Sequence, residues 1–214
     1  TTLDSKDAHV AEVRRWGGTR VWEAAPGEYY HSTTGELGGL WRNRGRTPQK
    51  MVGVGFTSQA GGRNRPYRRL EASFDPRVNF IFDGIGADEP IGDFPALVLE
   101  HGAAGFEIDR ADTVLGTPQH ALLLATADGF SDRYQLAIED QLVSSPNTGG
   151  SQNSLVRSDM VYFEGPCGGA VFSVSSISWC SCLSHNNRVN NVSRITENVL
   201  RRFASDNPIG GIDE

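Results

Sequence analysis

The contrast between many short β-like runs and one clear helix restricts the possible folds of this chain more than any other feature. Through the first two-thirds of the sequence, apolar and β-branched runs are bounded by Gly, Pro and Asp, and none is long enough to predict a helix. These runs cover residues 11–16, 19–24, 49–57, 77–85, 104–110, 120–127 and 134–140. The 25 Gly and 10 Pro indicate many turns between them. The sequence therefore predicts a β-rich mixed fold rather than a helical bundle.

The C-terminal part of the chain combines two more β-like runs with the one helix. The runs at 159–164 and 169–179 are separated by a Gly-rich turn. Apolar residues then recur at spacings of three and four, while Arg and Glu fall mostly on the opposite side, which predicts an amphipathic helix with Asn191 as its N-cap. Its apolar stripe consists of Val192, Ile195, Val199, Leu200 and Phe203.

The turn between the last run and this helix, residues 179–191, is crowded with polar groups. In open α/β sheets, ligand sites collect at the carboxyl ends of strands, where helix N-termini offer free backbone donors. Trp179 could form a pocket wall there, and Ser184 and Asn186 could hydrogen-bond a substrate. His185 could move a proton near neutral pH. The alternative is that these groups satisfy the backbone of the turn and cap the helix.

Glu107 lies between two apolar residues, Phe106 and Ile108, in a β-like run. In a strand its side chain points away from the face that its two neighbours share. If that side of the strand lines the core or a cleft, desolvation makes the carboxylate a stronger base and suits it to general base catalysis. If the side chain faces water, no special role follows. The sequence leaves both alternatives open.

A second polar cluster, residues 28–46, contains groups that suit a hard ferric ion, because carboxylate, phenolate and imidazole are all present. The candidate ligands are Glu28, Tyr29, Tyr30, His31 and Glu36. Tyr29 and Tyr30 would point to opposite faces of an extended chain, so at most one could enter a single site. The alternative is a loop that packs two tyrosines beneath its glycines.

Composition excludes several classes of protein. A net charge of −6 and scattered basic residues argue against a nucleic-acid surface. No apolar run approaches the length of about 18 residues that a membrane span needs, so we expect a soluble, cytoplasmic protein. Cys180 and Cys182 are too close for an unstrained disulfide and lack a second pair for zinc, which predicts free thiols. Because the first residue is not Met, we expect a fragment or a processed subunit.

The common enzyme signatures, such as the phosphate-binding loop and the nucleophile elbow, do not occur in this sequence. Ser, Asn, Gly and Pro gather near residues 144–155, which places an internal boundary there. The residues by themselves thus indicate a mixed α/β protein with a polar strand exit and no defined chemistry.

Four long stretches resemble the C-terminal part of the large (beta) subunit of the N,N-dimethylformamidase family. They include the strings "PGEYYHSTTGELGGLWRNRGR", "AAGFEIDRAD" and "SWCSCLSHNN". The stretches cover residues 26–59, 79–94, 102–112 and 168–203. Because these strings are long and unusual and together extend over nearly the whole chain, the resemblance is specific.

The resemblance implies a hydrolase that cleaves a small amide such as N,N-dimethylformamide to an amine and formate. It also implies Fe(3+) held by two tyrosines and a glutamate, and a small helical partner subunit. We further expect a homo-oligomer, because a sheet edge left exposed by a missing portion would favour association. The family's iron ligands fall in an upstream segment without a counterpart here, so we predict no metal ligand in this chain. Glu107, by its position in "AAGFEIDR", matches a proton-transferring or supporting glutamate.

The same resemblance predicts that the turn holding His185 lies beside the cleft of Glu107. We therefore expect Glu107 and His185 to be catalytic and Trp179, Ser184 and Asn186 to contact the substrate. Residues 1–155 are expected to form a β-rich cap or insertion, and residues 156–214 the closing strands and final helix of an amidotransferase-like α/β domain.

Two alternatives from different classes remain. One is a non-catalytic cap or subunit-interaction module that does not bind metal itself. The other is a hydrolase in which Cys180 or Cys182 is activated by His185.

Overall fold

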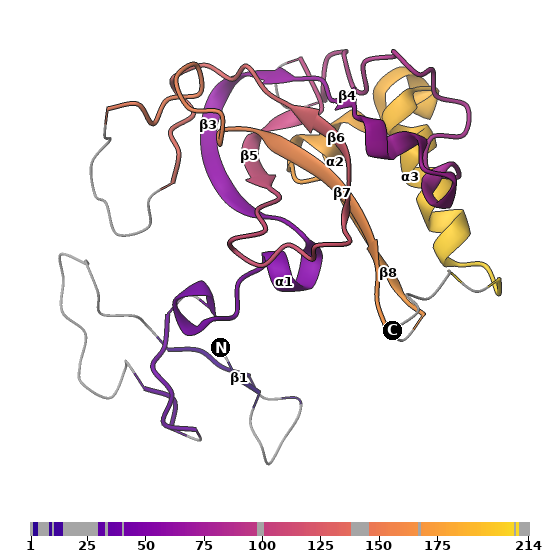
Figure 1. Cartoon of the computed structure of the whole chain (residues 1–214). Coiled ribbons are helices and arrows are strands. Elements are labelled where there is room, and N and C mark those ends of the chain that lie inside the picture. Colours follow the sequence, from indigo (N-terminus) through magenta and orange to yellow (C-terminus); the bar gives the residue numbers. More distant parts are fainter. Residues whose placement is uncertain are drawn as a thin grey trace. The chain divides into compact units, whose positions relative to one another are not determined.

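The computed structural model describes most of the chain, which forms two compact units (Figure 1). Unit 1 comprises Thr1–Pro48 and Ile138–Val143, and unit 2 comprises Gln49–Ala137 and Ser144–Glu214. The described residues are 2–3, 9, 11–14, 30–32, 34–39, 41–97, 101–137, 146–166, 168–207 and 209. All five residues predicted to be catalytic or substrate-binding belong to unit 2.

Unit 1 is built from short elements. Strand β1 (Thr2–Leu3) pairs antiparallel with β2 (Ala11–Glu12), and the 3-10 helix η2 spans Trp41–Arg44. An isolated antiparallel bridge joins Tyr30 to Leu37. Within the predicted run 11–16, only β2 is a strand among the described residues, and the run 19–24 lies outside them.

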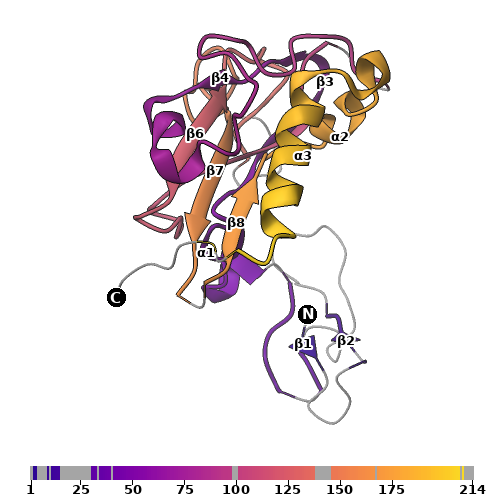
Figure 2. The same cartoon turned by 90° about the vertical axis from the view of Figure 1, so that its right-hand side faces the viewer.

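Unit 2 contains two antiparallel sheets (Figures 1 and 2). The first pairs β3 (Gly55–Arg65) with β5 (Ala104–Arg110). The second has the strand order β4, β6, β7, β8. Its strands are β4 (Arg68–Arg69), β6 (Leu122–Ala127), β7 (Ser158–Glu164) and β8 (Ala170–Ser173). Since β7 is an inner strand, every residue from Ser158 to Phe163 is buried.

Three strand predictions are confirmed, and the prediction for residues 77–85 is wrong. The runs at 104–110, 120–127 and 159–164 form β5, β6 and β7. The run at 77–85 instead begins within the 3-10 helix η4 (Pro76–Val78) and continues as turns. The backbone N–H of Arg77 donates to the carboxylate of Asp75 at 2.9 Å, and proline favours a first helical position, so the chain starts a helical turn here.

The runs at 49–57 and 169–179 each contain two different elements. In the first, α1 (Gln49–Val52) precedes β3, and Gly53 between them has a φ of 79° and lies against the side chains of Val161 and Phe163. In the second, β8 ends at Ser173, and Trp179 belongs to the short helix α2 (Ser178–Cys182). The run at 134–140 forms no strand over residues 134–137, and 138–140 lie outside the described residues.

Helix α3 (Asn191–Phe203) packs on the second sheet (Figure 2). The prediction of an apolar stripe is confirmed for Val192, Ile195 and Val199, which are buried in the core. Leu200 is 63% exposed and Phe203 36% exposed, so the buried stripe is narrower than the sequence predicts. The remaining 3-10 helices of unit 2 are η3 (Glu71–Phe74) and η5 (His185–Arg188).

The predicted N-cap of α3 is displaced by one residue. The side chain of Asn190, not Asn191, accepts a hydrogen bond from the backbone N–H of Ser193 at 2.8 Å. Asn191 instead accepts from the N–H of Gly92 at 2.9 Å and donates to Glu89 at 2.7 Å. Asn191 is therefore occupied by contacts with the segment 89–92, and Asn190 caps the helix.

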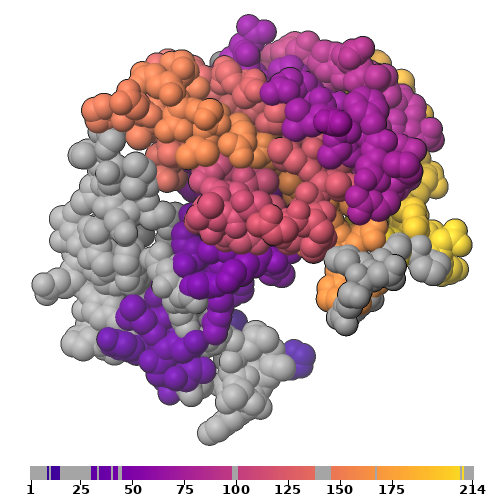
Figure 3. Space-filling model, viewed as in Figure 1, coloured from indigo at the N-terminus to yellow at the C-terminus, as the bar shows by residue number. Residues whose placement is uncertain are grey.

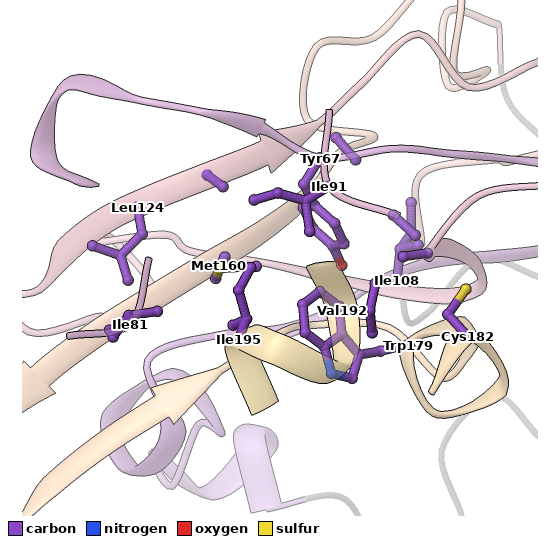
Figure 4. Close-up of a cluster of buried hydrophobic side chains, with 14 of the residues drawn as sticks. Tyr67, Ile81, Ile91, Ile108, Leu124, Met160, Trp179, Cys182, Val192 and Ile195 are labelled. Atoms are coloured by element: carbon purple, nitrogen blue, oxygen red, sulfur yellow. The ribbon is translucent and has the colours of Figure 1, made fainter. Parts of the chain in front are cut away.

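One hydrophobic core joins the sheets to α2 and α3 (Figure 4). Its labelled members come from all these elements and from the loops between them: Tyr67, Ile81, Ile91, Ile108, Leu124, Met160, Trp179, Cys182, Val192 and Ile195. The Trp179 ring meets Tyr67 edge to face at a centroid distance of 6.0 Å. Burial of both rings binds the segment after β8 to the second sheet.

These elements give a mixed fold of sheets with few helices, which is compatible with the predicted α/β class. The second sheet takes β4 and β6 from before residue 155 and β7 and β8 from after it. The division of the chain into residues 1–155 and 156–214 stays a prediction. No helix in the described part of the chain is long and apolar enough to cross a membrane.

A buried carboxylate lies at the beginning of β7. Asp159 is 0% exposed, and its carboxylate accepts hydrogen bonds from the hydroxyl of Thr126 (2.8 Å), the guanidinium of Arg157 (2.9 Å) and the N–H of Ala111 (3.0 Å). Desolvation raises the pKa of Asp159 above its ordinary value, while Arg157 acts in the opposite direction. The residue is therefore stable as a buried group only because its partners satisfy it.

In the space-filling view, the pink turn after β5 lies against the purple segment that contains α1 (Figure 3). Hydrogen bonds hold this turn in place. The Thr117 hydroxyl donates to the carbonyl of Gly53 at 2.7 Å and accepts from the N–H of Asp112 at 2.8 Å. Arg110, at the end of β5, donates to Thr57 at 2.9 Å and to Asp112 at 3.0 Å. These bonds fix the end of β5 that lies away from its strained part.

We expect Ile195→Ala to lower the free energy of unfolding by about 2–5 kcal/mol, because it leaves a cavity at a fully buried position of α3. Leu200→Ala on the same helix is the matched control and should change stability by about 0.5 kcal/mol or less. Urea unfolding followed by circular dichroism measures both. Equal losses in the two variants would contradict the packing of α3.

We expect Arg157→Met to lower the free energy of unfolding at pH 7 by at least about 2 kcal/mol, because it leaves the Asp159 carboxylate buried without its cation. Loss of the cation raises the pKa of Asp159 further. A raised folded-state pKa stabilises the protein at low pH, and this stabilisation disappears as the pH rises through it. The deficit relative to wild type should therefore shrink as the pH falls from about 7 to about 4.

Arg68→Met is the matched control, since the Arg68–Asp128 pair has side chains that are 60% and 56% exposed. It should cost about 1 kcal/mol or less at either pH. An Arg157→Met deficit that is independent of pH would show that Asp159 is not the group responsible.

Candidate active site

Glu107 lies near the middle of β5, opposite Gln59 of β3. Its side chain is half-buried. Within the described part of the chain, no group donates a hydrogen bond to its carboxylate, which leaves both oxygens available to a ligand. The position thus combines a rigid element, partial burial and acceptor oxygens that have no donor among the described residues.

The backbone immediately before Glu107 is strained. Phe106 has a φ of 64°, in the left-handed region that bulky residues rarely adopt. This conformation costs about 1–2 kcal/mol. It also breaks the alternation of the strand, because Phe106 is 46% exposed whereas Ile108 is fully buried. The two neighbours of Glu107 therefore do not share one face, as the sequence predicted they would.

Three hydrogen bonds from side chains hold this strained backbone in place. The N–H of Phe106 donates to the hydroxyl of Tyr134 at 2.9 Å. The hydroxyl of Ser176 accepts from the N–H of Gly105 at 2.8 Å and donates to the carbonyl of the same residue at 2.9 Å. Strained backbone persists only where the surrounding structure over-determines it, and such places cluster at functional sites.

Asn64 fills the space above Gly105. It comes from an irregular part of β3 where the register with β5 shifts. Its carboxamide donates to the carbonyl of Gly102 at 3.3 Å and to the hydroxyl of Ser178 at 3.1 Å. A Cβ added at position 105 would lie 1.9 Å from the Oδ1 of Asn64. Glycine is thus required here by a close approach of β3.

The segment that follows β8 carries the other predicted site residues. Trp179 is only 4% exposed, and its Nε1 donates to the hydroxyl of Thr196 at 3.0 Å. The ring thus lies in the core. Ser184 is exposed, and its hydroxyl has no hydrogen-bond partner in the described part of the chain.

His185 and Asn186 occupy η5, at the turn into α3. The imidazole stacks on Phe94 at a centroid distance of 4.1 Å, with the rings 9° from parallel. Asn186 begins three consecutive residues with positive φ, and its carboxamide donates to the carbonyl of Val189 at 3.0 Å. For Asn186 this contact fits the alternative interpretation, in which the side chain satisfies the backbone of its own turn.

The side chains of Glu107 and His185 lie beside different parts of β5. The N–H of Gly102 donates to the carbonyl of Phe94 at 3.1 Å, so the Phe94–His185 stack lies near the beginning of β5. Glu107 follows further along the strand, beside Ser176. Among the described residues, no hydrogen bond or ring contact joins Glu107 to η5.

Two hollows open beside β4, one of about 350 Å³ and one of about 400 Å³. Both contain Arg68, Thr126 and Asp128 in their walls. A third hollow of about 290 Å³ lies at the N-terminus of α3 and includes Arg188 and Arg194. The predicted site residues line none of these three hollows.

Comparison with known proteins identifies the relatives of this chain. The family described as "N,N-dimethylformamidase beta subunit-like, C-terminal" matches residues 2–192. The chain belongs to this family. It is 44% identical over 199 residues to the N,N-dimethylformamidase beta subunit of Paracoccus aminophilus and 42% identical over 199 residues to that of an Alcaligenes species.

Both alignments cover 93% of this chain but only 26% of the relative, so the chain spans about a quarter of the length of these curated relatives. The family resemblance predicted from the sequence is confirmed. The two relatives that carry the name dimethylformamidase beta subunit are thus much longer proteins than this chain.

Two tyrosines of unit 2 are engaged in ways that do not suit the Fe(3+) ligands implied by the resemblance. Tyr67 is fully buried and hydrogen-bonded to Ser158 at 2.9 Å, and burial raises its pKa, which opposes the phenolate form. Tyr162 donates to Glu164 at 3.0 Å. No three His, Cys, Asp or Glu residues of the described ranges gather where they could hold a metal ion.

The second predicted cluster, at 28–46, belongs to unit 1, and the structure describes part of it. Glu36 pairs with Arg46 at 3.1 Å. His31 is buried, and its Nδ1 lies 3.8 Å from the carboxylate of Glu12. Tyr30 is 56% exposed. Glu28 and Tyr29 lie outside the described residues.

The burial of Cys182 makes it unsuitable as a nucleophile. Cys182 is buried, and desolvation raises its pKa to about 11, so it stays protonated at neutral pH. Cys180 is exposed and unpaired as a thiol. The prediction of free cysteines is confirmed for these two residues, and the burial of Cys182 argues against its proposed role.

Sequence reasoning missed the residues that hold the strained backbone: Asn64, Tyr134 and Ser176. One signal was present, because a single glycine within a strand indicates a bulge or a close backbone approach, and Gly105 directly precedes Phe106. The partners themselves lie 28 to 114 positions from the residues to which they hydrogen-bond in this region, and no local pattern connects them.

We expect Gly105→Ala to lower the free energy of unfolding by about 1–3 kcal/mol, because the new methyl group would overlap the Asn64 side chain. Gly61→Ala is the matched control, since nothing lies within 4 Å of a Cβ there. It should change stability by about 0.5 kcal/mol or less. Chemical unfolding of both variants tests this, and a neutral Gly105→Ala would contradict the close packing of β3 on β5.

Proposed function

We propose that this chain is the C-terminal portion of a beta subunit that hydrolyses a small amide, such as N,N-dimethylformamide, to an amine and formate. Its membership of the family supports the class of reaction. The observation that carries the proposal is Glu107 on a strained backbone that side chains from two other segments hold in place. This is the arrangement expected of a functional carboxylate rather than of a solvated one.

In this proposal the Glu107 carboxylate transfers a proton. Hydrolysis adds water across the C–N bond, so one proton leaves the attacking water and one reaches the departing amine nitrogen. Glu107 can accept the first proton on a free oxygen and return it to the nitrogen as the bond breaks. The hydroxyl then remains on the carbonyl carbon as part of formate.

The residues of η5 and α2 have supporting roles in the proposal. His185 is the second proton-transferring group, and the exposed Ser184 and Asn186 contact the substrate. Trp179 was predicted to touch the substrate directly, but its burial assigns it to the core, from which it supports α2. These roles need η5 to face the same substrate as Glu107.

The Fe(3+) cofactor implied by the resemblance takes its ligands, in this proposal, from a portion of the subunit outside this chain. A small helical subunit and a homo-oligomer complete the assembly, which we place in the cytoplasm. The second sheet and α3 are then the closing part of an amidotransferase-like α/β domain, and the region before residue 156 is a cap or insertion.

A second candidate function is a non-catalytic cap or subunit-interaction module. It is favoured by one observation, namely that the hydroxyls of Tyr67 and Tyr162 are each hydrogen-bonded within unit 2 and that no three His, Cys, Asp or Glu residues of the described ranges gather where they could hold a metal ion. In that case the strain at Phe106 would serve packing alone, and Glu107 would be replaceable.

We expect Glu107→Gln to lower kcat of the assembled enzyme by about 10²- to 10⁴-fold, because an amide cannot accept the proton. Bound iron and the thermal midpoint should stay unchanged, because Glu107 has no hydrogen-bond donor among the described residues. Amide hydrolysis, metal analysis and calorimetry measure the three quantities. Glu71→Gln, which removes an exposed carboxylate elsewhere in unit 2, is the control for the loss of a negative charge and should leave the rate unchanged. A wild-type rate in a folded Glu107→Gln enzyme would favour the non-catalytic module.

A further inference from the structure

We infer that Tyr134 and Ser176 are positioning residues that aim the carboxylate of Glu107 by holding Phe106 in its left-handed conformation. This inference rests on the proposed function of Glu107. It goes beyond it by assigning a role in the reaction to two residues that do not touch the substrate. Hydrogen bonds with Tyr134 and Ser176 maintain the left-handed conformation at Phe106. This conformation sets the direction of the next side chain, Glu107.

The conformation at Phe106 requires an external support. A phenylalanine returns to an extended conformation unless something opposes it, because its Cβ is crowded at a φ of 64°. The register with β3 permits the irregularity, since β3 itself departs from regular pairing between Ala60 and Arg65. Phe106 pairs with Ala60, but the next pair towards the beginning of β5 joins Ala104 to Arg65, so regular pairing supports the backbone of Phe106 from one side only.

Tyr134 supplies the first support from a rigid position. Its ring is fully buried and lies 4.7 Å from that of Phe130, and its hydroxyl accepts the Phe106 N–H. The backbone after Tyr134 is anchored as well, because the N–H of Ala137 donates to the carbonyl of Thr57 at 2.8 Å. The phenol oxygen of Tyr134 is thus a hydrogen-bond acceptor in a fixed position. The backbone at Phe106 makes this bond only when its N–H points towards that oxygen.

Ser176 supplies the second support, one residue earlier. Its single hydroxyl binds both polar groups of Gly105, so it fixes the orientation of the peptide units on either side of that residue. The backbone next to Ser176 is also paired with β5, because the N–H of Asp109 donates to the carbonyl of Ser175 at 3.0 Å. Residues 175 and 176 therefore hydrogen-bond to β5 on both sides of Glu107, at Gly105 and at Asp109.

The consequence for Glu107 follows from the geometry of strands. Successive side chains of a regular strand point to opposite faces, and a local change of φ redirects the residues that follow. If Phe106 relaxed to an extended φ, the Glu107 carboxylate would leave its present direction. A displacement of about 1 Å at a reacting group can cost about 100-fold in rate.

The test compares Tyr134→Phe in two backgrounds of the assembled enzyme. In the wild-type background, loss of the hydroxyl removes the acceptor for the Phe106 N–H. We expect kcat for amide hydrolysis to fall by about 10- to 100-fold with KM changed by about 2-fold or less. In the Phe106→Gly background, the same substitution should have about a 2-fold effect or less, because glycine adopts a φ of 64° without steric cost.

Hydrogen exchange of the residue 106 amide provides a readout other than activity. The amide should exchange at least about 10-fold faster in Tyr134→Phe than in wild type, because its hydrogen bond is lost. Tyr162→Phe is the control, since Tyr162 is also buried but its hydroxyl binds Glu164. It should leave kcat and the exchange of this amide unchanged. If Tyr134→Phe does not fold, Ser176→Ala in the same two backgrounds replaces it.

The outcomes separate this inference from the function on which it rests. A wild-type rate in Glu107→Gln overturns the proposed function. A slow Glu107→Gln together with a wild-type rate in Tyr134→Phe overturns the inference alone. Equal loss of kcat in the wild-type and Phe106→Gly backgrounds also overturns it, because the hydroxyl would then act by a route other than the strained backbone. A loss confined to the wild-type background establishes the positioning role.

Discussion

The beginning of β7 joins the two sheets of unit 2, and the geometry of the candidate active site depends on this junction. The Ser158 hydroxyl donates to the carbonyl of Ser175 at 2.9 Å, and the Ser175 hydroxyl donates back to the carbonyl of Asp159. These bonds hold the segment after β8 against the inner strand of the second sheet. The next residue, Ser176, hydrogen-bonds to the N–H and the carbonyl of Gly105 in the first sheet. The packing of the second sheet therefore fixes the backbone conformation of β5 in the first.

The polar groups at this junction lose their hydration on folding, which costs free energy unless they are hydrogen-bonded. This requirement favours one arrangement of the segments. Asp159 and the hydroxyl of Tyr67 are fully buried, and each loses its hydration on folding. They are tolerated because partners satisfy them, and a fully satisfied buried network permits only one arrangement of the segments that contribute to it. Such uniqueness is what a strained residue such as Phe106 requires, since a looser junction would let the strand relax.

Sequence patterns predicted the elements whose signal is local. The run 104–110 and the stripe of Val192, Ile195 and Val199 depend on the period of the chain itself, and both were found where expected. The pattern failed at 77–85, where apolar residues fill the core from turns instead of a strand. It also failed at the cap of α3, because two adjacent asparagines are equivalent in sequence and a contact with Gly92 distinguishes them.

The sequence by itself determined the family, the strands β5, β6 and β7, and the amphipathic helix, because long shared strings and short-range periodicity are properties of the chain alone. Only the tertiary structure decided that Phe106 is left-handed, that Trp179 is buried and that the backbone before Glu107 is held by remote side chains. The physical reason is that each of these features depends on a partner far along the chain. The free energy that maintains them comes from burial and hydrogen bonds that exist only after the segments have met.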